Sequence, residues 1–147
     1  MTGSRAMNET IEKFGWPATL VREFDHWVVL ARAAQPTLGS VILAAKSDAT
    51  AFGELAAEAH AELKSATSVI EAMLTQAVGY SKINYLMLMM VDPNVHFHVI
   101  PRYAGAREWN GREFVDVGWP KLPDLGHAVA LEGEELGSLV AWLKSFA

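Results

Sequence analysis

The sequence predicts an α+β fold in which a long helix covers one face of an antiparallel sheet. Short runs rich in β-branched and aromatic residues come first, a long run with apolar residues at helical spacing follows, and two further apolar runs lie beyond it. Strands joined by short turns pair antiparallel, and an amphipathic helix buries its apolar stripe against a sheet. We therefore expect a five-stranded, mainly antiparallel sheet, one long helix packed on it, and a C-terminal helix.

The composition fits one globular domain over residues 1–147, because 51% of the residues are hydrophobic and 20% are charged. The absence of cysteine excludes disulfides, thiolate nucleophiles and cysteine-based zinc sites. The formal net charge of −5 argues against nucleic acid as a partner, since non-specific binders of phosphate backbones are basic.

The start of the chain and its longest apolar run bear on where the protein is located in the cell. Residues 1–8 are polar apart from scattered small and Met side chains, and no apolar segment typical of a signal peptide follows. The apolar run at residues 86–91 is far shorter than the roughly 20 residues that cross a bilayer. We expect a cytoplasmic protein without a membrane partner.

The first elements are short. Asn8 is placed to cap a helix that runs through Lys13. A first strand is expected at residues 18–24 and a second at 27–31, paired as a hairpin. A third strand is expected at residues 40–45.

The middle of the chain contains the long helix and a buried strand. Apolar residues at i, i+3 and i+4 spacing predict a helix over residues 50–78, with Gly79 at the position that ends it. Residues 83–90 are apolar at nearly every position, which predicts a central strand covered on both faces. The turn at residues 92–94 then leads back antiparallel.

The next strand, residues 95–103, contains two histidines. Because successive side chains of a strand point to opposite faces, His96 and His98 share one face about 7 Å apart, with Asn94 beside them. Pro101 cannot donate a ladder hydrogen bond, so we expect it to lead the chain out of the sheet. The opposite face is apolar: Val95, Phe97 and Val99.

Paired histidines on a strand have three uses, and the residues alone leave all three open. A neutral imidazole is a nucleophile or general base near neutral pH. Two imidazoles also supply two metal ligands, although zinc takes three or four and the other histidines are remote in sequence. Both side chains also fit a structural role with satisfied hydrogen bonds.

The C-terminal part changes character. Glycine and proline interrupt residues 104–126, which predicts a loop with one short strand at 112–117. Residues 134–146 are expected to form the closing helix.

The string Asn-Val-His-Phe-His-Val-Ile-Pro-Arg at residues 94–102 resembles the signature of the histidine triad (HIT) nucleotide hydrolases and transferases. That signature is His-φ-His-φ-His-φ-φ, often closed by Pro-Arg, where φ is apolar. Asn94 takes the place of the first histidine, His96 of the central one and His98 of the third. The order of elements over about residues 18–103 is similar to the HIT core, so the resemblance implies a HIT-like domain with an extension at 104–147.

The resemblance implies a reaction at the α-phosphorus of a dinucleoside polyphosphate, a nucleoside phosphoramidate or a related nucleotide. His96 is then the nucleophile, and a nucleotidyl-histidine forms before water or another acceptor takes the nucleotidyl group. The expected phosphate contacts are His98, Asn94 and Arg102, although Arg102, directly after the strand, is equally open to an exposed ion pair. No cofactor is required and no protein metal ligands are implied, although a divalent metal can accompany the substrate phosphates.

Other positions are expected to bind the nucleotide. Arg32 aligns with a position that often contacts ribose, and Ser40 with one where many members have a further histidine. Phe24 and Leu30 are expected to wall a base pocket, since base sites are mostly apolar. By analogy with part of the family, we expect a homodimer.

Two other functions remain open. The replacement of helper residues, Asn94 first among them, allows a nucleotide-binding module with weak or lost catalysis. The two histidines also allow a two-His metal-binding site.

Overall fold

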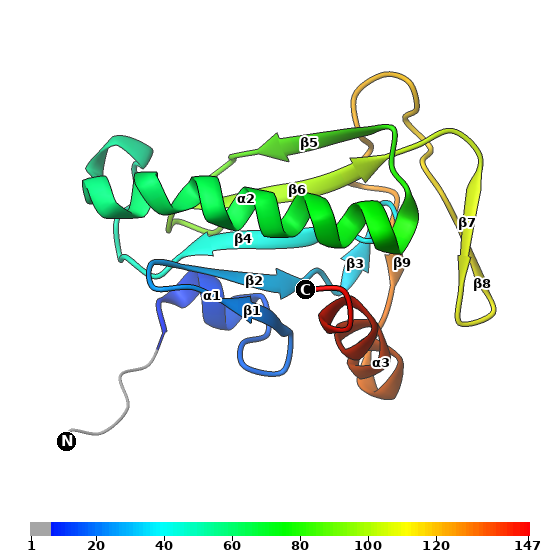
Figure 1. The fold of residues 1–147 in the computed structure, drawn as a ribbon, viewed down its shortest axis with the longest axis horizontal. Helices are drawn as coiled ribbons and strands as arrows, with labels where there is room; N and C mark the ends of the chain where they lie inside the picture. The colour runs from blue at the N-terminus through cyan, green and yellow to red at the C-terminus, as the bar shows by residue number, and fades with distance from the viewer. Residues whose placement is uncertain (1–6) are drawn as a thin grey trace.

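The computed structural model describes residues 7–147, and its centre is a five-stranded antiparallel sheet in the order β1-β2-β4-β6-β5 (Figure 1). Helix α2 crosses one face of this sheet along most of its length. The predicted α+β class, the antiparallel pairing and the helix on one face are therefore confirmed. The strands are β1 Leu20–Glu23, β2 Trp27–Ala31, β4 Val41–Ala45, β5 Lys82–Leu86 and β6 His96–Arg102.

The short helix α1, Glu9–Lys13, lies on the opposite face of the sheet from α2 (Figure 1). Asn8 caps it as predicted, because its Oδ1 accepts a hydrogen bond from the Ile11 backbone N–H at 2.9 Å. Ile11 packs with sheet residues in a small core that is separate from the main one. Its sheet members are Val28, Leu30, Ile42 and Ala44.

Helix α2, Ala57–Val78, begins seven residues later than the predicted start at residue 50. A 3-10 turn, Phe52–Glu54, precedes it, and Glu54 Oε1 accepts a hydrogen bond from the Ala51 N–H at 3.1 Å. This bond caps the start of the 3-10 turn, and Leu55 and Ala56 then take extended conformations with ψ of 148° and 150°, which separate the turn from α2. The predicted end is confirmed, because Gly79 adopts the left-handed conformation with φ 57° and closes the helix.

The prediction of a central strand at residues 83–90 was wrong. Strand β5 ends at Leu86 and lies at the edge of the sheet, where its residues are half-buried or exposed. Its neighbour β6 is the inner strand instead. An all-apolar run does not distinguish a covered strand from an edge strand that continues into an apolar loop, as residues 87–91 do here.

The prediction that Pro101 leads the chain out of the sheet was also wrong. Pro101 lies inside β6 opposite Ile83, and its carbonyl accepts a hydrogen bond from Thr37 Oγ1 at 2.7 Å. A proline removes one donor but leaves its carbonyl free to accept. Strand β6 therefore continues through Arg102.

The C-terminal extension is more structured than predicted. The expected strand at residues 112–117 is half of a hairpin that pairs β7, Ala106–Trp109, with β8, Arg112–Val115. Its turn is Asn110-Gly111, with φ of 54° and 73°, and Asn-Gly is the sequence signal for such a turn. Helix α3, Gly133–Lys144, confirms the predicted closing helix.

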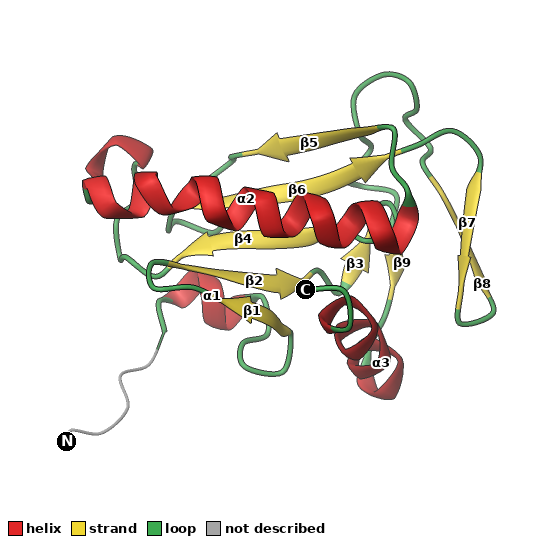
Figure 2. Cartoon of the chain, in the orientation of Figure 1, coloured by secondary structure: helices red, strands yellow, loops and turns green. Residues whose placement is uncertain are grey.

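Two short strands join the extension to the core. Strand β3, Ala34–Gln35, pairs antiparallel with β9, Val129–Ala130, and no sequence pattern indicated either strand. Figure 2 shows α3 following β9 and lying beside the β1 and β2 edge of the sheet, against which it packs. Residues 104–147 are thereby held to the histidine-bearing core.

No helix within residues 7–147 is long and apolar enough to cross a membrane. The prediction about residues 1–8 concerns positions that lie mostly outside the described residues.

Candidate active site

His96 and His98 lie on the sheet face that α1 partly covers. His96 stands opposite Ala44 and His98 opposite Ile42, and both partners belong to the small core under α1. The imidazole rings meet edge to face, with centroids 5.1 Å apart. The prediction of two histidines in contact on one strand face is confirmed, and this pair makes that face the candidate site.

The hydrogen bond of His96 sets its tautomer. Its Nδ1 lies 2.7 Å from the backbone carbonyl oxygen of Asn94. A carbonyl only accepts, so Nδ1 carries the proton in the neutral ring and Nε2 keeps its lone pair. An imidazole in this state is a nucleophile whose direction of attack is fixed by the backbone.

His98 is neutral over the physiological range. Burial above all, and then the nearby positive charge of Arg32 and the neighbouring His96, lower its pKa to about 4, while Asp92 acts in the opposite direction. Its Nδ1 is buried without a hydrogen-bond partner. A neutral imidazole with unused polar capacity beside His96 is suited to contact a ligand's polar atoms.

A cavity of about 200 Å³ opens over the two histidines, which form part of its wall. Residues 88–92 line its other side, so apolar side chains of this loop face the imidazoles. Asp92 at its rim forms an ion pair with Lys13 of α1, with Nζ and Oδ1 2.7 Å apart. The contact links α1 to the loop across the site.

A second cavity, of about 320 Å³, lies on the other side of the ring of Phe14 from the histidines. The Phe14 ring centroid lies 5.6 Å from that of His96 and 5.9 Å from that of His98, and Phe14 also lines the second cavity. Arg32 is part of the same wall, as is Leu136 from α3. Phe14 therefore stands between the second cavity and the two histidines.

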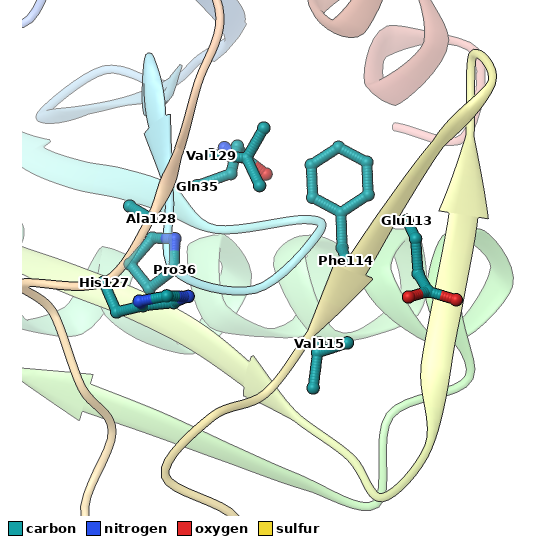
Figure 3. Close-up of a pocket in the computed structure, with 8 residues that line it drawn as sticks. All are labelled: Gln35, Pro36, Glu113, Phe114, Val115, His127, Ala128 and Val129. Atoms are coloured by element: carbon teal, nitrogen blue, oxygen red, sulfur yellow. The ribbon is translucent and has the colours of Figure 1, made fainter.

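A third cavity, of about 130 Å³, lies elsewhere, between the β8 strand and the β3–β9 pair (Figure 3). Its walls come from residues 35–36, 113–115 and 127–129. None of the residues that the sequence predicted for the site lines it. The chemistry of the paired histidines is therefore separate from this cavity.

Asn94 was predicted to contact phosphate, but its side chain forms hydrogen bonds within the protein. Oδ1 accepts hydrogen bonds from the backbone N–H and the hydroxyl of Thr10, at 3.2 and 3.1 Å. Nδ2 donates to the Asp48 carbonyl at 2.9 Å. The side chain is 7% exposed, so it ties α1 to the loops beside the site and does not support a phosphate contact.

Arg102 was also predicted to contact phosphate, and the structure does not support this. Its Nε and Nη2 donate to the two carboxylate oxygens of Asp116 at 2.7 and 3.0 Å, and Nη1 donates to Asn84 Oδ1 at 2.8 Å. Arg102 is 3% exposed. The strand continues past Pro101, which places this guanidinium in a buried ion pair.

Three of the four residues predicted to contact the nucleotide are instead packed within the protein. Phe24 packs against the main core, which is the α2 side of the sheet. Leu30 lies on the histidine face but is fully buried in the small core under α1. Ser40 is fully buried, and its hydroxyl donates to the Thr37 carbonyl at 2.8 Å. Arg32 alone lines a cavity at the site.

Several residues at the site were not predicted. Phe14 and Lys13 come from the end of α1, more than 80 positions before the histidines. Nothing in the sequence indicates that α1 lies across this sheet face, because the contact depends on the tertiary arrangement. Asp92 had a weak signal, since its turn leads directly into the histidine strand.

No three His, Asp or Glu side chains in the described range 7–147 gather as a metal site. His96 and His98 thus supply two imidazoles without a third ligand of these types. Zinc takes three or four ligands, so these two imidazoles alone do not complete a closed zinc site.

Comparison with solved structures identifies the fold. A histidine triad protein from Sinorhizobium meliloti superposes with a TM-score of 0.69 at 23% identity, covering 97% of this chain and 96% of that one. A histidine triad protein from Marinobacter aquaeolei gives 0.65 at 24%, covering 97% and 100%. Plasmodium falciparum diadenosine triphosphate hydrolase, solved with cyclomarin A, gives 0.63 at 11%, covering 93% and 92%.

The chain therefore has a histidine triad fold, as the string at residues 94–102 indicated. No family model matches the sequence, and no curated protein matches it.

Proposed function

We propose that the protein is a nucleotide hydrolase or nucleotidyl transferase that acts through a nucleotidyl-histidine intermediate on His96. The observation that carries the proposal is the hydrogen bond from His96 Nδ1 to the Asn94 carbonyl, because it leaves the Nε2 lone pair available for attack. The proposed substrates are dinucleoside polyphosphates, nucleoside phosphoramidates or related nucleotides. A structural neighbour that is a diadenosine triphosphate hydrolase supports this class.

In the first proposed step, the Nε2 lone pair attacks the α-phosphorus and the bond to the leaving group breaks, with its electron pair going to the leaving group. Nδ1–H donating to the carbonyl offsets the positive charge that develops on the ring. In the second step, water or another acceptor attacks phosphorus and gives up its proton to the solvent, the P–N bond breaks, and His96 regains its lone pair. Two steps through an imidazole avoid the need for a strongly activated water.

His98 is the proposed phosphate contact. Its neutral ring stands 5.1 Å from that of His96 and carries one N–H that is suited to a phosphate oxygen. The mechanism needs no protein-bound cofactor, and a divalent ion enters, where it is used, with the substrate phosphates.

The test is His96→Ala, assayed for release of nucleoside monophosphate from a panel of diadenosine polyphosphates and adenosine phosphoramidate. We expect a loss of about a thousandfold or more, as for other nucleophile deletions. His127→Ala is the matched control, because it removes an exposed imidazole from the separate cavity in Figure 3. A wild-type rate for the His96 variant on every substrate that the parent cleaves contradicts the assignment, and a trapped adduct on His96 supports it.

A second function, nucleotide binding with weak or lost catalysis, is favoured by one observation. Asn94 replaces the first histidine of the signature, and its side chain is committed to Thr10 and Asp48. Calorimetric binding of nucleoside monophosphates without turnover of the panel supports this alternative. The two-His metal site is tested by metal analysis of protein purified without chelator or affinity histidines.

We also propose a homodimer and a single domain over residues 1–147. Met90 and Val91 are 85% and 80% exposed next to the edge strand β5, which supports association. The β3–β9 pairing supports one domain, because it joins the extension to the core. Sedimentation equilibrium checks the dimer, and one cooperative unfolding transition checks the domain. The cytoplasmic location stays a prediction.

A further inference from the structure

Arg32 is a partly buried cation that no carboxylate matches. Its Nη1 donates to the Ala34 carbonyl at 2.6 Å, and its Nε is buried without a hydrogen-bond partner. Within residues 7–147 no Asp or Glu forms an ion pair with it. Burial of a charge without a counter-ion is unfavourable, and a guanidinium has five N–H donors to satisfy. An anionic ligand would supply the missing negative charge and accept hydrogen bonds from the guanidinium.

The cavity that Arg32 lines has the character of a site for an anion with an apolar part. Its volume of about 320 Å³ lies in the range of small-molecule sites. Its charged lining residues are Lys13 and Arg32, both positive, and Lys13 already has Asp92 as a partner. Arg32 thus supplies the unmatched charge. The apolar wall comes from Phe14, Ala33, Ala34 and Leu136.

Arg32 also lies near the histidines. It follows Leu30 by two residues, which places both on the histidine face. Its backbone N–H donates to the carbonyl of Ser40, which lies just before β4 and two residues before Ile42, the partner of His98. Its charge is close enough to lower the pKa of His98. A nucleoside whose base lies in this cavity and whose 5′-phosphate lies at the histidines would have its sugar between them, where Phe14 contacts both imidazoles and Arg32 lines the wall.

We propose that the cavity takes nucleotides that carry a second phosphoryl group on the ribose, at the 2′ or 3′ position, and that Arg32 binds this group. The inference rests on the proposed function, because it uses His96 and His98 to place the 5′-phosphate. A planar guanidinium binds phosphate through two parallel hydrogen bonds. In another nucleotide-binding fold, an arginine near the ribose accommodates a 2′-phosphate in the same way.

The experiment is calorimetric titration of the full chain at one ionic strength with adenosine 5′-monophosphate, adenosine 2′,5′-bisphosphate and adenosine 3′,5′-bisphosphate. We expect one bisphosphate to bind about tenfold more tightly than the monophosphate, or better. Arg32→Gln should remove that difference, and Arg32→Lys should restore part of it. Arg22→Gln is the matched control, because it removes an equal charge from an exposed position on β1 and should keep the difference.

Three outcomes overturn the inference. Equal wild-type affinity for all three nucleotides contradicts it, while monophosphate binding and His96-dependent turnover leave the proposed function standing. If Arg32→Gln weakens all three nucleotides equally, Arg32 binds the 5′-phosphate and the inference is wrong. If none binds and no substrate is cleaved, the proposed function fails and the inference fails with it. Circular dichroism checks that Arg32→Gln is folded. If it is not, the difference in affinity between monophosphate and bisphosphates, compared between the wild type and Arg32→Lys, tests the inference.

Discussion

The backbone carbonyl of Asn94 accepts the Nδ1 hydrogen of His96 at 2.7 Å, while the Asn94 side chain bonds to Thr10 and Asp48. One residue therefore orients the proposed nucleophile through its backbone and anchors α1 through its amide. The hydrogen bonds of this amide are made to Thr10 and Asp48 and not to the histidines.

We predict that Asn94→His lowers stability and does not raise turnover. An imidazole cannot accept from both Thr10 donors and also donate to the Asp48 carbonyl, so buried polar groups lose their partners, at a cost of about 2–4 kcal/mol. Urea unfolding and the monophosphate-release assay measure both effects. Gln76→Ala, which removes an exposed amide from α2, should change neither. A variant as stable as the parent and faster would contradict the structural role of Asn94.

The low pKa of His98 predicts a pH dependence of stability. The folded-state pKa of about 4 lies below the ordinary value of 6.5, so between these values the unfolded chain binds a proton that the folded chain does not. The contribution of His98 therefore makes the protein less stable as pH falls from about 6.5 to about 4, and has no such effect above that window.

We expect His98→Gln to reduce the loss of unfolding free energy between about pH 7 and about pH 5. Urea unfolding at both pH values measures it. His127→Gln removes an exposed imidazole and serves as the control. An unchanged pH dependence in His98→Gln would show that His98 does not have the depressed pKa.

The Arg102–Asp116 pair is predicted to serve stability and not nucleotide binding. Its side chains are 4% and 2% exposed, so Asp116→Ala leaves a buried guanidinium unpaired and should cost about 3–5 kcal/mol. The double variant Arg102→Met with Asp116→Leu should recover much of that loss, because both charges are gone. Urea unfolding measures stability, and calorimetry should find unchanged nucleotide affinity in the folded double variant. A large loss of affinity would restore Arg102 as a phosphate contact.

The Lys13–Asp92 pair is predicted to tune the charge at the site. Its lysine side chain is 53% exposed, so Lys13→Met should change stability by less than about 1 kcal/mol. The same change should weaken binding of nucleoside monophosphate, whereas Asp92→Asn should strengthen it by removing a negative charge from the histidine cavity. Calorimetry at low and high salt measures the nucleotide affinity of both variants, with Asp25→Asn in an exposed turn as the control. Effects of the same sign for both variants would contradict this account.

Local patterns in the sequence predicted a large part of the fold. The two-residue period of residues 95–100 placed His96 and His98 together, and Gly79 ended α2 where expected. The Asn110-Gly111 turn also had a clear local signal, although the hairpin around it was not predicted. These features depend on backbone sterics and nearest neighbours, which a linear sequence contains.

The hydrogen-bond and packing partners of residues near the histidines could not be predicted in the same way. Arg102 and Asn94 are polar residues next to the histidines in sequence, and each is engaged by a partner at least 14 positions away. Phe14 reaches the histidines only because α1 folds over that face of the sheet. A sequence pattern does not distinguish one polar side chain from another, whereas their surroundings in the fold differ. Only the folded structure therefore shows which polar side chains remain available to a ligand.

The sequence by itself therefore determined the α+β class, the antiparallel strand pairing, the long helix and the pair of histidines on one strand face, because each follows from periodicity and turn chemistry. Only the tertiary structure decided that Asn94 and Arg102 are anchors, that Ser40 and Leu30 are buried, and that Arg32 remains an unmatched charge beside the site. The physical reason is burial: a polar group taken from water must find a partner, and contacts between distant segments decide whether that partner is protein or ligand.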